Sequence, residues 1–143
     1  MGFKRAMKQS ESRDDFMYQV KEKDWKLFRK MLPEWQDKYL ERLTKEYIEL
    51  LSSDRQASDK FWALDKRIKD DKKRTGVIAR DISRSHMFQH IIDLMDEGAI
   101  TEDDLKEFSE DLRDTISNRQ INHRIALHPE NVRKYKQKRS VRL

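Results

Sequence analysis

The stretch PEWQDKYLERLTKEYIELL, residues 33–51, decides the predicted fold, because its apolar residues recur every three or four positions. This spacing places them on one side of an α-helix. The residues on that side are Trp35, Tyr39, Leu43, Tyr47, Leu50 and Leu51. Pro33 suits the first helical position, where the N–H that it lacks would have no partner. A helix with so broad an apolar face needs other segments packed on it to be stable in water.

The same helical spacing recurs outside this stretch and predicts further helices over residues 24–32, 58–75, 83–97 and 101–116. Residues 24–32 either form a separate short helix or join the central one as a kinked rod. Ser58 is the expected N-cap of the second helix, whose apolar stripe is Phe61, Leu64 and Ile68.

Turn signals delimit the later helices. Gly76 and Gly98 are the expected left-handed stops, and Thr101 with Asp104 resembles a capping pair. The stripe Leu105, Phe108, Leu112 and Ile116 follows and fades at residues 117–118, where we expect a bend or a new helix. Pro129 is expected to open a last helix.

The composition agrees with a purely helical fold. The chain has 143 residues, enough for one core, and only three Gly and two Pro. The alternation of Val, Ile and Thr that marks strands is nearly absent. We predict an all-α, single-domain bundle of five or six helices with basic, partly flexible termini. Its expected parts are a basic N-terminal arm (1–20), a helical bundle (21–127) and a basic C-terminal helix or tail (128–143).

The composition also bears on the size of the core, on the cellular location and on membrane contact. Hydrophobic residues make up 36% of the chain and charged residues 41%, so we expect a thin core under an ionic surface. The absence of cysteine excludes disulfides and thiolate chemistry and favours a cytoplasmic location. No apolar run approaches the roughly 20 residues of a membrane span, so we expect no membrane contact.

Charge is distributed unevenly along the chain. Residues 128–143 and residues 66–84 each carry a net charge of +5, whereas residues 93–114 carry −8. Basic runs bind nucleic acid by neutralising phosphates and releasing counterions. The residues predicted to bind nucleic acid are Lys72, Lys73, Arg74, Arg133, Lys134, Tyr135, Lys136, Lys138, Arg139 and Arg142. The alternative is that these side chains aid solubility or pair with the acidic segment of the same chain.

The acidic segment 102–114 supports a second functional hypothesis. Its carboxylates can hold a basic protein partner, or imitate nucleic-acid charge and block an enzyme's binding channel. The candidate protein-binding residues are Glu102, Asp103, Glu107, Glu110, Asp111 and Asp114. A solvated helix whose first-turn acids favour the helix dipole is the simpler alternative.

Catalytic and metal motifs are weak or missing. Residues 93–104 have the outline of a calcium loop, but Met95 occupies a ligand position and Asp104 replaces the usual Glu. His86 and His90 are one helical turn apart, yet the metalloprotease Glu is absent. There is no nucleophile motif or phosphate-binding glycine loop. We therefore predict no enzymatic activity, no metal site and no cofactor.

Trp25 and Trp62 fall outside the main apolar stripes. A tryptophan in such a position lies either at the rim of a small core or at the centre of an interface. The rim is favoured, because thin cores commonly leave tryptophan partly exposed.

Three runs of the sequence carry a resemblance: VKEKDWKLFRKMLPEWQDKYLERLTKEYIELL, SDKFWALDKRIKDDKK and EGAITEDDLKEFSEDL. They resemble short uncharacterised bacterial proteins associated with mobile elements, some of which are labelled "multidrug transporter". The resemblance covers about residues 20–116 and implies no known activity, and the transporter label conflicts with the absence of an apolar span. It favours a small accessory or regulatory protein.

The preferred function is therefore a non-catalytic accessory protein that contacts nucleic acid, or a nucleoprotein complex, through its basic arm and tail. The alternative is a protein–protein regulator or inhibitor that acts through residues 102–114 on a nucleic-acid-handling enzyme. The sequence does not determine the oligomeric state.

Overall fold

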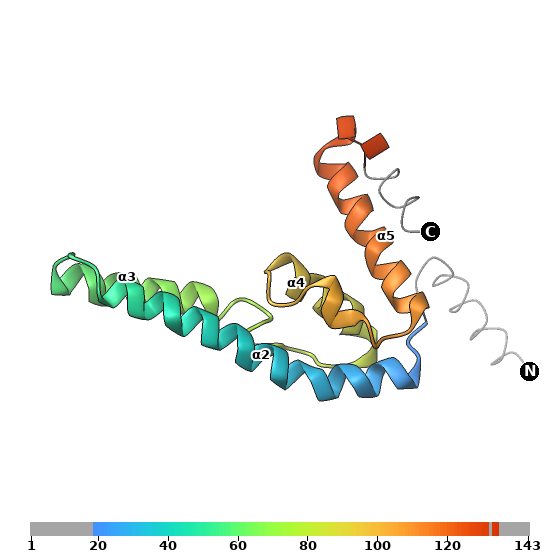
Figure 1. The fold of residues 1–143 in the computed structure, drawn as a ribbon, viewed down its shortest axis with the longest axis horizontal. Helices are drawn as coiled ribbons and strands as arrows, with labels where there is room; N and C mark the ends of the chain where they lie inside the picture. The colour runs from blue at the N-terminus through green and yellow to red at the C-terminus, as the bar shows by residue number, and fades with distance from the viewer. Residues whose placement is uncertain (1–18, 132, 135–143) are drawn as a thin grey trace, which may run out of the picture.

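A computed structural model describes residues 19–131 and 133–134, and every regular element in this part of the chain is helical. The α-helices are α2 (Glu22–Leu51), α3 (Ala57–Asp71), α4 (Met87–Asp96) and α5 (Glu110–Leu127) (Figure 1). The shorter 3-10 helices are η1 (Arg84–His86), η2 (Glu102–Leu105) and η3 (Pro129–Asn131). The predicted all-α class is confirmed for these residues, whereas most of the predicted basic termini lies outside them.

The long helix α2 runs through Pro33 without ending, so the predicted helix start at Pro33 is wrong and the single rod is correct. Proline in a helix interior removes one backbone hydrogen bond and costs about 3 kcal/mol. The side chains of Phe28, Leu32, Trp35 and Tyr39, on both sides of the proline, are all buried. Each contributes about 1.5–3 kcal/mol on burial, which outweighs the cost of the proline.

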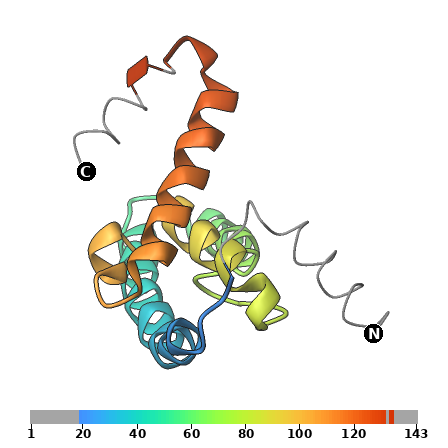
Figure 2. The same cartoon turned by 90° about the vertical axis from the view of Figure 1, so that its right-hand side faces the viewer.

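The main core lies under the first half of α2. Both views show α4 and the beginning of α5 close to this half of the helix (Figures 1 and 2). The core side chains that are nearly or fully buried include Phe28, Trp35, Met87, Ile91, Leu94, Leu112 and Ile116. All four residues of the predicted stripe from Leu105 to Ile116 are buried, although an α-helix does not cover the whole segment.

A break at Ser109 separates η2 from α5, where the sequence predicted one helix. The Ser109 side chain caps α5 by accepting a hydrogen bond from the backbone N–H of Leu112 at 3.2 Å. The Asp24 carboxylate of α2 in turn accepts bonds from the Ser109 N–H at 2.9 Å and hydroxyl at 2.6 Å. Asp24 is fully buried, so this network fixes the start of α5 against the start of α2.

The second half of α2 pairs with α3 in a helical arm that projects away from the core (Figure 1). The predicted Ser58 cap is wrong, since α3 starts at Ala57 and its N-cap, Gln56, makes no side-chain cap bond. The predicted stripe is correct only in part. Leu64 and Ile68 are half-buried, whereas 64% of Phe61 is exposed.

Gly76 does not form the predicted helix stop, because α3 already ends at Asp71. Among the described glycines only Gly98 has a positive φ, of 77°, which confirms the stop predicted there. Gly76 is instead required by a close approach, since a Cβ at this position would lie 2.5 Å from the Tyr39 ring. The Glu97 carboxylate holds the turn by accepting bonds from the N–H groups of Thr75 and Gly76 at 2.9 and 3.0 Å.

Helix α5 continues to Leu127 without the bend or new helix predicted at residues 117–118. Polar residues at these positions end the apolar stripe but do not interrupt helical hydrogen bonding. The second half of the helix extends beyond the core (Figure 2), and Ile121 and Ile125 remain half-buried. Pro129 opens the 3-10 helix η3 rather than an α-helix in the described residues.

We predict that Asp24→Asn lowers the free energy of unfolding by about 2–3 kcal/mol, because charge-assisted hydrogen bonds to Ser109 are replaced within a buried site. Urea denaturation followed by circular dichroism would measure the change. Asp111→Asn is the matched control, since it removes a carboxylate whose ion pair with Lys21, at 2.8 Å, is solvent-exposed. The control should change stability by less than about 1 kcal/mol. Equal effects of the two variants would contradict the role assigned to Asp24.

Candidate nucleic-acid interface

The basic cluster predicted at residues 72–74 is partly occupied by contacts within the protein. The Arg74 guanidinium donates a hydrogen bond to the Tyr39 hydroxyl at 2.7 Å and lies 3.8 Å from the Asp71 carboxylate. The bond to Tyr39 raises the pKa of Arg74 above its ordinary value. Lys73 lies 3.8 Å from Asp70, and Lys72 is exposed without an ion pair to a described residue. Arg74 therefore secures the loop after α3 although its side chain is exposed, and Lys72 is the residue of the three without an ion pair to a described residue.

Asp71 is the buried centre of a second polar network in the arm. Its carboxylate accepts a hydrogen bond from the Tyr47 hydroxyl at 2.5 Å and one from the Arg67 Nε at 3.1 Å. Arg67 also bonds Glu46 of α2 at 3.0 Å. Burial and the bond to Asp71 raise the pKa of Tyr47 to about 12. These contacts tie α3 to α2 through charge, where the sequence predicted an apolar contact.

We predict that Tyr47 stabilises the fold up to about pH 10 and that this contribution is lost as the pH rises toward 12. The sign follows because folding favours the neutral phenol, whose pKa is about 12 in the fold against 10.0 in the unfolded chain. Phenolate absorbance during a pH titration should show a tyrosine that ionises near pH 12, and Tyr47→Phe should remove this transition. Ionisation of every tyrosine near pH 10 would contradict the proposed network.

A basic surface that the sequence reasoning missed lies on the first half of α2. We call it the α2 cationic face and define it as Lys23, Lys26, Arg29 and Lys30, all of which are exposed. None of the four forms an ion pair with a described residue. The steps of three and four between these positions place them on adjoining rows of one helical surface. This spacing could have predicted the surface from the sequence. The acidic residues Glu22 and Asp24, however, gave the segment a mixture of positive and negative charge.

The two acids of this segment are already committed elsewhere. Asp24 is buried against Ser109, and Glu22 accepts two hydrogen bonds from the Arg84 guanidinium at 2.9 and 3.1 Å. The bond from Arg84 lowers the pKa of Glu22, and the charges of Lys26 and Arg29 add to this effect. The α2 cationic face therefore adjoins one exposed carboxylate, that of Glu22, whose hydrogen bonds come from Arg84 and not from the four cations.

Trp25 anchors this surface to the core. Only 6% of the Trp25 side chain is exposed, so it belongs to the core and not to its rim. The guanidinium groups of Arg29 and Arg84 lie 5.8 and 5.4 Å from the centre of the indole ring. Such cation–π contacts fix the position of each charge without neutralising it.

The predicted basic tail lies apart from the other predicted basic residues. Arg133 and Lys134 are exposed just beyond η3, whereas Tyr135, Lys136, Lys138, Arg139 and Arg142 lie outside the described residues. The two views place the end of α5 far from the end of α3 (Figures 1 and 2). The structure thus does not bring the predicted residues 72–74 and 133–134 together.

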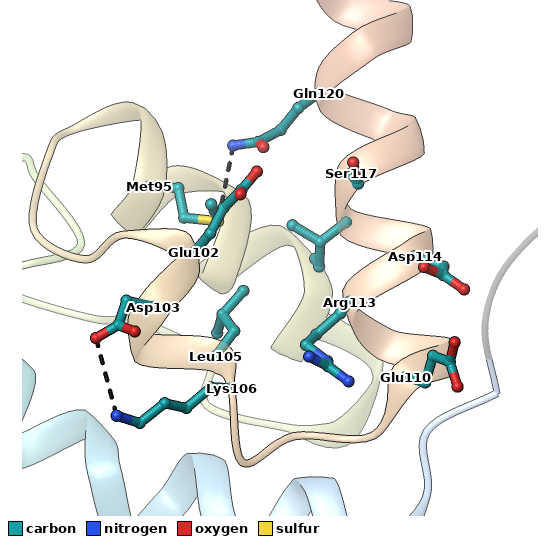
Figure 3. Close-up of a pocket in the computed structure, with 11 residues that line it drawn as sticks. Met95, Glu102, Asp103, Leu105, Lys106, Glu110, Arg113, Asp114, Ser117 and Gln120 are labelled. Atoms are coloured by element: carbon teal, nitrogen blue, oxygen red, sulfur yellow. Dashed lines mark hydrogen bonds and ion pairs between the residues drawn. The ribbon is translucent and has the colours of Figure 1, made fainter. Parts of the chain in front are cut away.

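The acidic segment lines a groove of about 510 Å³ between η2 and α5 (Figure 3). Four of the predicted protein-binding residues line this groove: Glu102, Asp103, Glu110 and Asp114. Glu107 and Asp111 do not line it. Figure 3 shows Glu110 and Asp114 pointing to the outer side of α5, while Glu102 points toward Gln120. Lys106 and Arg113 also line the groove, so its charge is mixed.

The candidate metal ligands have other contacts. Asp104 accepts a bond from the Thr101 N–H at 2.8 Å, which confirms the capping pair. The His86 Nδ1 lies 2.8 Å from the Ser83 hydroxyl, and the His90 Nε2 lies 3.2 Å from the Asp81 carbonyl oxygen. Within the described ranges, no three His, Asp or Glu side chains are grouped to hold a metal ion.

Comparison of the chain with protein-family models, with curated proteins and with solved structures gives no match. The resemblance to mobile-element proteins therefore stays a prediction. Within residues 19–131 and 133–134, no helix has the length and apolar character needed to cross a membrane.

Proposed function

We propose that this protein is a non-catalytic accessory protein that contacts nucleic acid through the α2 cationic face, with the basic tail as a second contact. The observation that carries the proposal is the set of four exposed cations without an ion pair to a described residue. A small accessory or regulatory role linked to a mobile element agrees with the resemblance noted in the sequence.

The α2 cationic face is suited to phosphate binding because it is rigid. The adjacent residues of α2, Trp25 and Phe28, are buried in the core, so the helix cannot rotate to hide its lysines. The packed helix fixes the backbone of these residues, so binding restricts only their side chains. Four phosphate contacts would give a plot of log affinity against log salt with a slope of about −3.6.

We predict that Lys26→Glu with Lys30→Glu weakens nucleic-acid binding at least tenfold at low salt and makes the salt slope shallower by about 1.8, because two phosphate contacts are lost. Fluorescence anisotropy of a labelled oligonucleotide at several salt concentrations would measure both quantities. The matched control is Lys38→Glu with Lys45→Glu, which changes the net charge equally at exposed positions on the second half of α2.

The control variant should retain most of the affinity, since neither lysine belongs to the α2 cationic face. Equal losses in the two double variants would indicate a general charge effect and would contradict the proposed surface. Absence of binding by the unaltered protein at low salt would contradict nucleic-acid binding altogether.

The groove between η2 and α5 supports a second candidate function, in which a basic segment of a protein partner binds its carboxylates. Four carboxylates line the groove, two of them on its outer edge, beside apolar side chains such as Leu105 and Ile116. This combination fits a peptide that carries both lysine or arginine and an apolar residue. A regulator or inhibitor of a nucleic-acid-handling enzyme would present such a groove to its target.

We predict that Glu110→Lys with Asp114→Lys abolishes capture of such a partner in a pull-down from the native cell, because lysines at the outer edge of the groove then repel its basic side chains. Glu107→Lys with Asp111→Lys, which makes the same change in charge outside the groove, should leave capture intact. Thermal denaturation would verify that both variants fold. Unchanged capture by the first variant would argue against the groove as the binding surface.

A further inference from the structure

Two large aromatic side chains, Phe61 and Trp62, are exposed on the α2–α3 arm. The exposed fractions are 64% for Phe61 and 63% for Trp62. Their ring centres lie 5.0 Å apart in an edge-to-face arrangement, so each ring supports the other. The other described tryptophans, Trp25 and Trp35, are buried, which leaves Trp62 as the accessible indole of the described chain.

Trp62 lies at the centre of the outer face of α3. The opposite face of α3 holds Asp71, which is buried against α2. At 100° per residue, Lys66 and Lys69 fall within about 40° of Trp62 around the helix axis. Measured along the helix axis, Lys66 lies about 6 Å and Lys69 about 10 Å beyond Trp62. The outer face of α3 therefore presents two aromatic rings followed by two cations, with Asp59 and Asp65 on its two borders, about 60° from Trp62.

The charged residues beside Trp62 indicate which kind of ligand the surface fits. Lys66 is exposed and forms no ion pair with a described residue. Lys69 lies 2.9 Å from Asp65, but this pair is solvent-exposed and contributes little. Protein interfaces are enriched in tryptophan but depleted of lysine, whereas surfaces that bind single-stranded nucleic acid combine both. The outer face of α3 thus fits a ligand with exposed aromatic rings and regularly spaced negative charge.

We propose that the outer face of α3 binds single-stranded nucleic acid, with bases stacked on Trp62 and Phe61 and phosphates held by Lys66 and Lys69. This inference rests on the proposed function and adds a preference for single strands. Bases of a duplex are stacked on one another and cannot stack on an exposed aromatic ring, whereas those of a single strand can. Stacking on one aromatic side chain contributes about 1–3 kcal/mol per base.

The experiment compares binding of a labelled 20-nucleotide thymidine oligomer with binding of a duplex of equal length. Trp62→Ala is expected to weaken binding of the single strand about 5- to 150-fold, which is the stacking contribution expressed as an affinity ratio. Binding of the duplex should change less than about twofold, because only the α2 cationic face and other basic residues contact it. The single strand should also quench the tryptophan fluorescence of the unaltered protein.

Three further variants make the result specific. Trp62→Phe should retain much of the affinity for the single strand, since it keeps an aromatic ring. Ile48→Ala, which removes another exposed apolar side chain from the same arm, should leave binding unchanged. Lys66→Glu with Lys69→Glu should make the salt slope for the single strand shallower by about 1.4.

Two outcomes would overturn this inference while leaving the proposed function intact. In the first, Trp62→Ala binds the single strand as tightly as the unaltered protein, yet Lys26→Glu with Lys30→Glu still loses binding. In the second, sedimentation shows a dimer that Trp62→Ala dissociates, which would make the outer face of α3 a contact between copies of the chain. Failure of the unaltered protein to bind either oligonucleotide would overturn both proposals.

Discussion

The continuity of α2 through Pro33 is the constraint on which the rest of the structure depends. The first half of the helix covers the core, and its second half carries α3 as a projecting arm (Figure 1). Were the helix to end at the proline, the two parts would be joined by a hinge. Buried side chains on both sides, Leu32 before the proline and Trp35 after it, hold the helix in one piece.

The middle of α2 gathers the loops that connect the arm to the core. Tyr39 packs against Gly76, accepts a bond from Arg74 and lies 4.9 Å below the Arg42 guanidinium, which also bonds the Gly98 carbonyl at 3.0 Å. These contacts hold the guanidinium groups of Arg42 and Arg74, for which the sequence alone shows no partner. The tertiary fold therefore determines which cations make structural contacts and which remain available to a ligand.

Apolar periodicity predicted most of the core, because the burial of Phe28 or Leu112 depends on local spacing that a single sequence reveals. The candidate site was harder to predict, since a charged residue becomes available or occupied through partners distant in sequence. Arg84 meets Glu22 across 62 positions, and Asp24 meets Ser109 across 85. Net charge summed over segments does not include those pairings. It therefore predicted a site at residues 72–74 and missed the α2 cationic face.

The two proposed binding surfaces lie at different levels of one rigid rod. Residue 30 of α2 and the end of this helix, beside which α3 begins, are separated by about 30 Å at 1.5 Å per residue. Two weak contacts on one rigid support combine into stronger binding only when a single ligand spans both. A flexible single strand can follow the rod, whereas a stiff duplex of the same length meets both surfaces only if they face one way. Because of the shape of α2, loss of either surface is therefore expected to change the affinity for a single strand and the affinity for a duplex by different factors.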